Sequence, residues 1–234
     1  MNYIFDLYGT LVDIKTDEES ADVWQTACEL LGESPEEWRR VRELYAKLCR
    51  SRVTVPEAEF DLCEVFSDML AKYGKSRGDM GELAWNFREA STRKLRLFPG
   101  VIKQLGELRK KGGVYLLSNA QSCFTRRELD MLGLTPLFDG IIISSEVGIK
   151  KPSKDVFELA LERFKLKKNE CIYVGNDMRD DILGASRAGL MTAYVPTEQS
   201  GSYPELNIPE PTYSAKDHTE LWRILYGLSP NPNS

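Results

Sequence analysis

Three short apolar runs in this chain are each followed closely by polar residues that could take part in covalent or metal chemistry. The runs cover residues 3–5, 114–117 and 171–174. The polar residues that follow them are Asp6, then Ser118 and Asn119, then Asn176 and Asp177. Short β-prone runs predict buried strands, and parallel sheets place their ligands at the carboxyl ends of the strands. The sequence therefore predicts a polar site at one sheet edge, with Asp6 as a nucleophile or a metal ligand.

A fourth segment, residues 146–152, is expected to bring a lysine to the same edge, because it contains Lys151 followed by Pro152. The proline fixes a turn there and favours Lys151, rather than Lys150, as the lysine that points inward. In such a site a carboxylate attacks, while a hydroxyl and an amide hold the oxygens of the group under attack. An ammonium neutralises the charge that develops, and further carboxylates such as Asp181 hold a cation.

The segment after the first run is predicted to be helical from residue 16 to residue 95. Thr16 and the acidic residues after it are typical of an N-cap with an acidic first turn, and Ser34-Pro35-Glu36-Glu37 is a capping box. Two further helices are expected to begin near Pro56 and Asp79. Four consecutive helices joined by short loops indicate a helical bundle.

After residue 98 the pattern changes to strands that alternate with helices. The expected strands cover residues 114–117, 141–143, 171–174 and 191–195. Such alternation implies right-handed crossovers and a doubly wound parallel sheet, so the fold class is α/β with an inserted α-helical bundle. We expect a core domain at 1–15 and 96–228, a helical cap domain over the strand ends at 16–95, and a frayed tail at 229–234.

The composition excludes several classes of function. The 234 residues carry a net charge of −5 and no basic run, which argues against nucleic-acid binding. No apolar run is long enough to cross a membrane, and no signal peptide is expected. The five scattered cysteines indicate reduced thiols in a cytoplasmic protein. The single histidine, His218, is expected at the surface, which leaves no Ser-His-Asp triad or multi-histidine metal site.

Four segments of the chain resemble, in order and at fitting spacing, the four motifs of the haloacid dehalogenase superfamily. The segments are Phe5-Asp6-x-Tyr8-Gly9-Thr10-Leu11, Leu117-Ser118-Asn119, Gly148-x-x-Lys151-Pro152 and Val174-Gly175-Asn176-Asp177-x-x-x-Asp181. The helical insertion is similar to the cap that one branch of this superfamily carries after its first motif. The resemblance covers the core of the chain from residue 1 to about residue 195.

The resemblance implies a role for each matching residue. The catalytic residues would be Asp6 as covalent nucleophile, Lys151 and Asp181. The substrate-binding residues would be Ser118, Asn119 and Thr10, which also supports the loop. The ligands of a Mg²⁺ cofactor would be Asp6, the backbone carbonyl of Tyr8, Asn176 and Asp177.

Two departures from the usual motifs point in opposite directions. Phosphatases of the superfamily usually carry a second aspartate where this chain has Tyr8, and a phenol with a pKa of about 10 is a poor base at neutral pH. Tyrosine at this position resembles the metal-free 2-haloacid dehalogenases, whose leaving halide needs no proton. The fourth motif instead favours a metal, because Asp6, Asp177 and Asp181 would repel one another without a cation among them.

Arg39, within the predicted cap, is the expected substrate-binding residue of that region. Its place between Trp38 and Tyr45 resembles that of the arginine that receives the halide in the dehalogenases. In a phosphatase the same arginine would bind a carboxylate or a second phosphate of the substrate.

Three functions stay open at this point. The first is a Mg²⁺-dependent phosphohydrolase of a small phosphorylated metabolite, and the second is a metal-free 2-haloacid dehalogenase. The third is a phosphate-binding protein that has lost turnover. Each would take a small-molecule ligand, either a phosphate ester or a haloacid, with no nucleic-acid or membrane partner. The chain is expected to be a monomer or a homodimer.

Overall fold

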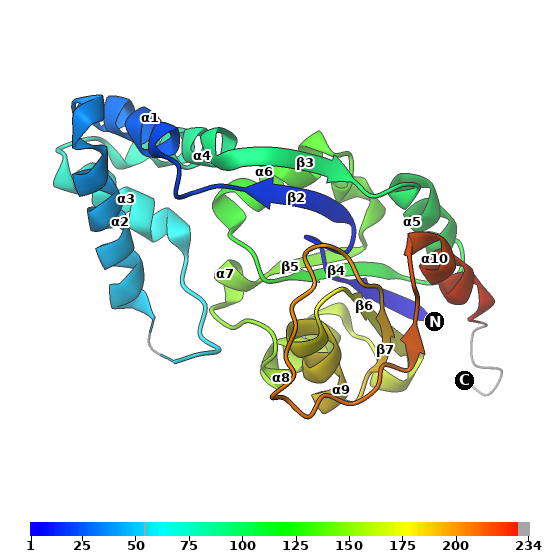
Figure 1. Ribbon diagram of the computed structural model, residues 1–234. Helices are drawn as coiled ribbons and strands as arrows, with labels where there is room; N and C mark the ends of the chain where they lie inside the picture. Colours follow the sequence, from blue (N-terminus) through cyan, green and yellow to red (C-terminus); the bar gives the residue numbers. More distant parts are fainter. Residues whose placement is uncertain (54, 229–234) are drawn as a thin grey trace.

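A six-stranded parallel sheet, in the order β5-β4-β1-β6-β7-β8, forms the centre of the molecule (Figure 1). The computed structural model describes residues 1–53 and 55–228, so the predicted tail at 229–234 lies outside the described residues. The strands are β1 Asn2–Phe5, β4 Val114–Ser118, β5 Gly140–Ile143, β6 Cys171–Gly175, β7 Met191–Tyr194 and β8 Tyr213–Ser214. This sheet confirms the predicted α/β fold class.

The winding of the chain reverses at β1, which pairs with β4 on one side and with β6 on the other. The chain runs outward from β1 through β4 to β5, and then returns to β6 and β7 on the opposite side. Doubly wound sheets bind their ligands at such a switch point, outside the carboxyl ends of the strands. Asp6 directly follows β1, so the topology places it at this position.

Helices cover both faces of the sheet (Figure 1). One face packs against α5 Val101–Arg109, α10 His218–Gly227 and α6 Ser122–Met131. The other face packs against α8 Lys154–Phe164 and α9 Gly184–Arg187. Tyr3 and Phe5 belong to the first hydrophobic cluster and Ile4 to the second, as the two-residue period of a strand requires.

Four helices form the insertion, and we call them the cap. They are α1 Ala21–Leu31, α2 Trp38–Arg52, α3 Leu62–Lys72 and α4 Met80–Ser91. They surround a hydrophobic cluster in which the rings of Trp24 and Phe87 lie 5.1 Å apart and those of Phe66 and Phe87 lie 5.5 Å apart. This cluster is separate from the two clusters of the sheet, and core helix α6 contributes Phe124 to it.

The third and the first cap helices begin later than predicted. The third helix begins at Leu62 rather than at Pro56, because the Asp61 carboxylate accepts a hydrogen bond from the backbone N–H of Cys63 at 2.8 Å and caps the helix there. The first helix begins at Ala21 rather than at Thr16, because the chain up to Thr16 is extended.

Two antiparallel strands that the sequence did not predict join the cap to the core. They are β2 Val12–Thr16 and β3 Thr92–Leu97. The fourth helix consequently ends at Ser91 instead of near residue 95, and the predicted boundaries at 15/16 and 95/96 fall inside this ribbon. Asp13 accepts bonds from Lys94 at 2.8 Å and from Arg96 at 3.0 Å, across the ribbon. These partners lie more than 80 residues apart, beyond the reach of local pattern.

None of the helices in the described part of the chain has the length and apolar composition needed to span a bilayer.

Candidate active site

Asp6 lies at the carboxyl end of β1 with its side chain fixed on both oxygens. Its Oδ1 accepts a hydrogen bond from Lys151 Nζ at 2.7 Å, and its Oδ2 accepts one from Thr10 Oγ1 at 3.0 Å. The turn between them needs Gly9, whose φ is +88° and where a Cβ would lie 2.5 Å from Asn176 Nδ2. The loop after β1 therefore folds tightly against the loop after β6 and orients the carboxylate.

Lys151 is almost completely buried and links three groups of the site. Its ammonium lies 2.7 Å from Asp6 Oδ1, 2.7 Å from Asp181 Oδ1 and 2.9 Å from the Tyr173 hydroxyl. Burial alone would lower the pKa of Lys151, but the carboxylates of Asp181 and Asp6 raise it well above its usual value. Lys151 is therefore a permanent cation between the two carboxylates.

Repulsion between Asp6 and Asp181, which favoured a metal in the sequence, is relieved by a side chain of the protein. The cation between Asp6 and Asp181 is the ammonium of Lys151, which belongs to the chain itself. Asp181 also accepts a bond from the backbone N–H of Asp177 at 2.9 Å, so its two oxygens hold Lys151 and the fourth-motif loop in place. The negative charges of Asp6 and Asp181 are therefore compensated without a metal ion.

Asn119 holds the backbone of Lys151 from the neighbouring strand. Its Oδ1 accepts the Lys151 N–H at 2.8 Å, and its Nδ2 donates to the Lys151 carbonyl at 3.0 Å. The cap also contacts this loop, because the N–H of Lys150 donates to the Glu57 carbonyl and the N–H of Glu59 donates to the Gly148 carbonyl, both at 3.0 Å. Asn119 thus positions the lysine, in addition to lining the cleft described below.

Ser118 carries a buried hydroxyl that has no hydrogen-bond partner among the described residues. It ends β4, next to β1, and is 1% exposed. Buried hydroxyls in folded proteins nearly always have a partner, so this one is a donor for a group that the chain does not supply. An oxygen of a substrate bound beside Asp6 would fill that role.

Asp177, which the sequence suggested as a metal ligand, is engaged within its own loop. Its Oδ1 accepts from the N–H groups of Arg179 and Asp180, at 2.9 and 2.7 Å, and caps the π-helical turn Met178–Leu183. Its Oδ2 accepts from the Tyr203 hydroxyl at 2.7 Å and the Gly201 N–H at 3.3 Å. Both oxygens are occupied, so the structure gives Asp177 a structural role.

The remaining suggested metal donors lie together in the loops after β1 and β6. The Thr10 hydroxyl lies within hydrogen-bond distance of both Asp6 Oδ2 and Asn176 Oδ1, the latter at 3.2 Å. In the described part of the chain no group of three or more His, Cys, Asp or Glu side chains is arranged to hold a metal. Magnesium sites commonly use only one or two carboxylates, with water and substrate phosphate completing the shell. The mixed set of Asp6, Asn176 and the Tyr8 carbonyl fits that pattern.

Tyr8 is tied to a buried ion pair that joins the cap to the core. Its hydroxyl donates to Glu128 Oε2 on α6 and lies 2.9 Å from Thr125 Oγ1. Arg88 on α4 donates to both oxygens of Glu128, at 2.5 and 3.2 Å. Burial and the Glu128 carboxylate raise the pKa of Tyr8 further above that of a free phenol. Tyr8 is therefore protonated at neutral pH and cannot act as a base.

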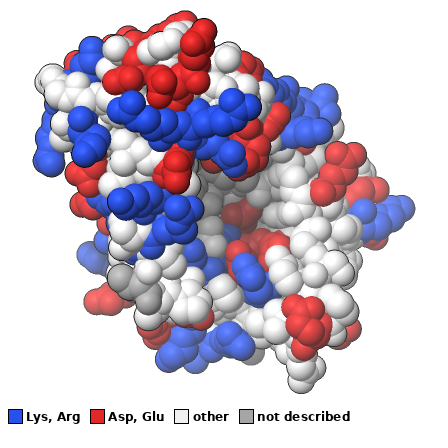
Figure 2. Space-filling model, turned by 60° about the vertical axis from the view of Figure 1, so that its left-hand side comes forward, with Lys and Arg blue, Asp and Glu red and all other residues white. Residues whose placement is uncertain are grey.

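An open cleft of about 360 Å³ adjoins these groups between the cap and the core. The described residues that line it are Tyr8, Ile14, Thr16, Glu18, Tyr45, Phe60, Leu62, Arg88, Asn119, Ala120, Gln121 and Phe124. Figure 2 shows a hollow between the two parts of the molecule, with acidic and basic atoms at its floor. The volume suits a small organic group.

Arg39 is not brought to this cleft. It is exposed on α2, and its guanidinium lies over the ring of Trp38 at 4.4 Å from the centroid. The arginine that lines the cleft is Arg88, near the end of α4. The sequence did not single out Arg88 or Glu128, because neither stands in a motif and their pairing depends on how the cap packs against α6.

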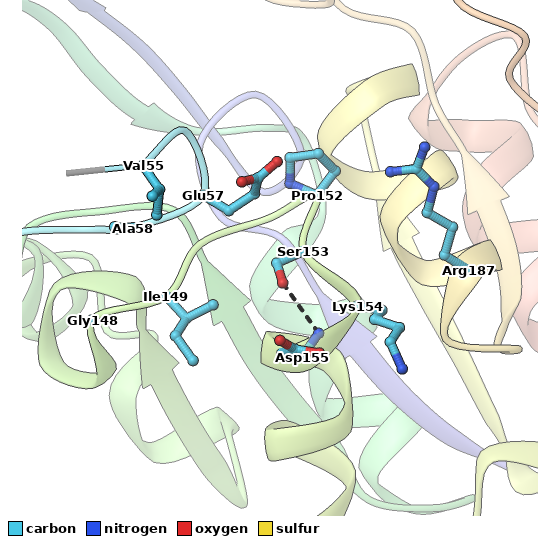
Figure 3. Close-up of a pocket in the computed structure, with 10 residues that line it drawn as sticks. All are labelled: Val55, Glu57, Ala58, Gly148, Ile149, Pro152, Ser153, Lys154, Asp155 and Arg187. Atoms are coloured by element: carbon cyan, nitrogen blue, oxygen red, sulfur yellow. Dashed lines mark hydrogen bonds between the residues drawn. The ribbon is translucent and has the colours of Figure 1, made fainter. Parts of the chain in front are cut away.

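A second cavity, of about 540 Å³, lies on the other side of the Lys151 loop (Figure 3). Cap residues Val55, Glu57 and Ala58 line one wall, while the start of α8 and Arg187 line the other. Its charged lining residues are mixed in sign, with Glu57 and Asp155 beside Lys154 and Arg187. Asp6 lines neither cavity, but Tyr8 and Asn119, from the loops that follow β1 and β4, line the first cleft, so we place the chemistry there.

His218 is half-buried, which corrects the expectation of a free surface side chain. It begins α10, its ring stacks on Phe98 with centroids 4.1 Å apart, and its Nε2 lies 2.7 Å from the Thr10 carbonyl. A carbonyl can only accept, so Nε2 carries the proton and donates. Burial lowers the pKa of His218, which keeps the ring neutral. His218 thus supports the backbone of the loop that orients Asp6, a contact 208 residues apart in sequence.

The fold and this site define a hydrolase with an aspartate and a lysine at the switch point of a doubly wound sheet. The sequence model of the haloacid dehalogenase-like hydrolases matches residues 2–189, and the chain belongs to this family.

Curated relatives include phosphatases. A glyceraldehyde 3-phosphate phosphatase of Methanothermobacter thermautotrophicus is 37% identical over 105 residues, which is 44% of this chain and 46% of the relative. The putative HAD-hydrolase YfnB of Bacillus subtilis is 28% identical over 161 residues, or 68% and 67% of the two chains. The first of these matches spans about half the length of the relative.

Solved structures of both kinds of enzyme share the fold. A HAD phosphatase from Thermococcus onnurineus superimposes with a TM-score of 0.64 at 20% identity, covering 98% of this chain and 99% of that one. A 2-haloacid dehalogenase from Pseudomonas syringae gives a TM-score of 0.65 at 23% identity, covering 96% and 97%. At these identities the likeness establishes the fold alone.

Proposed function

We propose that this hydrolase is a Mg²⁺-dependent phosphohydrolase of a small phosphorylated metabolite and works through an aspartyl-phosphate. The observation that carries the proposal is the arrangement around Asp6. An oriented carboxylate, a buried permanent cation on Lys151 and the unpartnered hydroxyl of Ser118 meet at one sheet edge. A phosphoryl group needs a nucleophile, charge neutralisation and a hydrogen-bond donor, which these three groups supply.

In the first half of the reaction an Asp6 oxygen forms a bond to phosphorus, and the bond from phosphorus to the leaving oxygen breaks. The Lys151 ammonium neutralises charge on the transferred group, and Ser118 donates a hydrogen bond to one of its oxygens. The leaving oxygen takes a proton from water, because Tyr8 is a weaker acid than a free phenol here. In the second half water adds to phosphorus, releases phosphate and restores the Asp6 carboxylate.

Magnesium would be held by Asp6, the Tyr8 carbonyl and Asn176, with Asp177 holding the loop rather than the ion. When bound, it would neutralise the phosphate oxygens that face Asp6. Mg²⁺ binds with few protein carboxylates when the substrate contributes phosphate oxygens. This donor set therefore suits a phosphate ester better than a haloacid.

A haloacid would meet an unfavourable site in the cleft. Its carboxylate would require a cationic partner, but the guanidinium of Arg88 already forms two bonds to Glu128. Arg39, the expected halide-binding arginine, is exposed on α2 and does not line the cleft. The names of the phosphatase relatives agree with the proposal.

A panel of phosphate esters and 2-haloacids, each assayed with Mg²⁺ and with EDTA, tests the reaction. We expect phosphate release with Mg²⁺, a loss of at least about 100-fold in EDTA, and no halide release. Halide release in EDTA would establish the dehalogenase instead. Phosphate binding without either activity would identify a protein that has lost turnover.

Replacing Tyr8 by aspartate should raise the turnover of esters with poor leaving groups more than that of esters with good ones. An aspartate there would supply the missing general acid, and general acids raise rates by about 10²–10⁴-fold when the leaving group is poor. We expect turnover of an alkyl phosphate to rise at least about tenfold, and turnover of p-nitrophenyl phosphate to change less than about threefold. Tyr8→Asn leaves a similar space without the acid and is the matched control. Equal changes for both esters, or a rise in the Tyr8→Asn variant, would contradict this explanation.

A further inference from the structure

The cleft lined by Tyr8 and Asn119 contains one carboxylate that neither the fold nor the reaction uses. Glu18 follows β2 in the turn before α1, is half-buried, and lines the cleft. Its backbone carbonyl accepts a bond from Trp24 Nε1 at 2.7 Å, which anchors the turn to the cap core. Among the described residues its carboxylate has neither a hydrogen-bond nor an ion-pair partner. Burial raises the pKa of Glu18, and the charge of Arg88 opposes this shift.

The positive charge of Arg88 is already compensated within the cleft wall. The guanidinium forms two bonds to Glu128, which is 1% exposed, and lies over the ring of Phe124 at 4.5 Å from the centroid. Glu128 additionally accepts the Tyr8 hydroxyl. Arg88 and Glu128 together contribute no net charge, so Glu18 leaves this part of the cleft with one uncompensated negative charge.

Aromatic rings line the same cleft as this carboxylate. Tyr45 and Phe60 line the same cleft, from α2 and from the segment before α3, and both are half-buried. Tyr45 is held in place by the rings of Trp24 and Phe87, at 5.0 and 5.5 Å between centroids. Aromatic faces attract cations, and they attract them more strongly in partly desolvated sites. A cleft lined by both a carboxylate and aromatic rings therefore suits a positively charged group.

We propose that the cleft selects phosphate esters whose leaving group carries an ammonium, which Glu18 binds between Tyr45 and Phe60. The inference rests on the proposed function, because it assigns Asp6, Lys151 and Ser118 to the phosphoryl end of the same substrate. An ammonium donates hydrogen bonds that the Glu18 carboxylate can accept, and it neutralises the uncompensated charge. An ester with a carboxylate in its leaving group would instead be repelled by Glu18. Glu18 is therefore a specificity residue that does not touch the reacting atoms.

Three esters of similar size and different charge provide the test: phosphoethanolamine, ethyl phosphate and phosphoglycolate. Binding is measured by calorimetry on an Asp6→Asn variant, and kcat/KM is measured on the wild type with Mg²⁺. A unit charge a few ångströms from a partly buried carboxylate interacts strongly enough to change affinity at least about tenfold. We expect the affinity of Asp6→Asn and the kcat/KM of the wild type to be at least about tenfold higher for phosphoethanolamine than for phosphoglycolate.

The Glu18→Gln variant keeps the shape of the side chain and removes its charge. In this variant we expect the affinities, and the kcat/KM values, for phosphoethanolamine and phosphoglycolate to differ by less than about threefold. The values for ethyl phosphate should change by less than about threefold. Glu29→Gln, which removes an exposed carboxylate of α1, is the matched control and should leave the difference between the two charged esters unchanged.

The outcomes separate the two proposals. The inference is overturned if the wild type does not distinguish phosphoethanolamine from phosphoglycolate, or if Glu18→Gln distinguishes them as well as the wild type does. This holds even when all three esters are hydrolysed. If Mg²⁺-loaded wild type turns over none of the esters, the proposed function fails, while the affinities of Asp6→Asn for the two charged esters still decide the role of Glu18. A failure of all three esters to bind overturns both.

Discussion

The Asp6→Asn variant is expected to lose at least about 1,000-fold in kcat for phosphate esters while folding normally. Asparagine keeps the size of the side chain and can still accept from Thr10, but its amide cannot form the acyl phosphate. Lys151 retains Asp181 at 2.7 Å, so its charge stays compensated in the variant. Steady-state phosphate release measures the loss, and the midpoint of thermal unfolding shows that the fold is intact.

The covalent intermediate gives a second measure of the same step. Wild-type protein quenched in acid during turnover should carry a phosphoryl group on the peptide that contains Asp6, and the variant should carry none. Asp17→Asn, an exposed carboxylate beyond β2, is the matched control and should keep full activity. Substantial activity in Asp6→Asn, or a phosphoryl group on another residue, would exclude Asp6 as the nucleophile.

Breaking the ion pair between Arg88 and Glu128 is expected to have the largest effect on stability. Arg88 is 6% exposed and Glu128 is 1% exposed, and the pair joins cap helix α4 to core helix α6. Arg88→Met leaves a buried carboxylate without its cation, which typically destabilises a protein by about 3–5 kcal/mol. The free energy of unfolding, measured in urea, should fall by that amount.

The double variant Arg88→Met, Glu128→Met distinguishes pairing from packing. It removes both buried charges together, so it should regain most of the stability lost in Arg88→Met. Arg126→Met is the matched surface control, because Arg126 pairs with Glu146 where both side chains are partly exposed, and we expect it to cost less than about 1 kcal/mol. If Arg88→Met is as mild as Arg126→Met, the pair does not hold the cap to the core.

The main elements of the fold follow from local pattern. Five strands of the sheet were predicted because each is a short apolar run, and the cap helices were predicted from patterns at their starts such as Ser34-Pro35-Glu36-Glu37. Ser34 was predicted to cap its helix, and it accepts a hydrogen bond from the Glu36 N–H. The β2–β3 ribbon was not predicted, because it is stabilised by partners such as Asp13 and Arg96 that are far apart in the sequence.

The sequence by itself predicted that Asp6 and Ser118 lie at one sheet edge, because each stands where a parallel strand ends, and it favoured Lys151 as the lysine that points to that edge. Only the tertiary structure decided what surrounds them. It placed the Lys151 ammonium between Asp6 and Asp181, engaged Asp177 in hydrogen bonds within its own loop and placed Arg39 outside the cleft. It also left the Glu18 carboxylate, among the described residues, without a hydrogen-bond or ion-pair partner in the cleft. Strand ends are set by local chain chemistry, whereas the partners of a charge depend on which distant surfaces pack together.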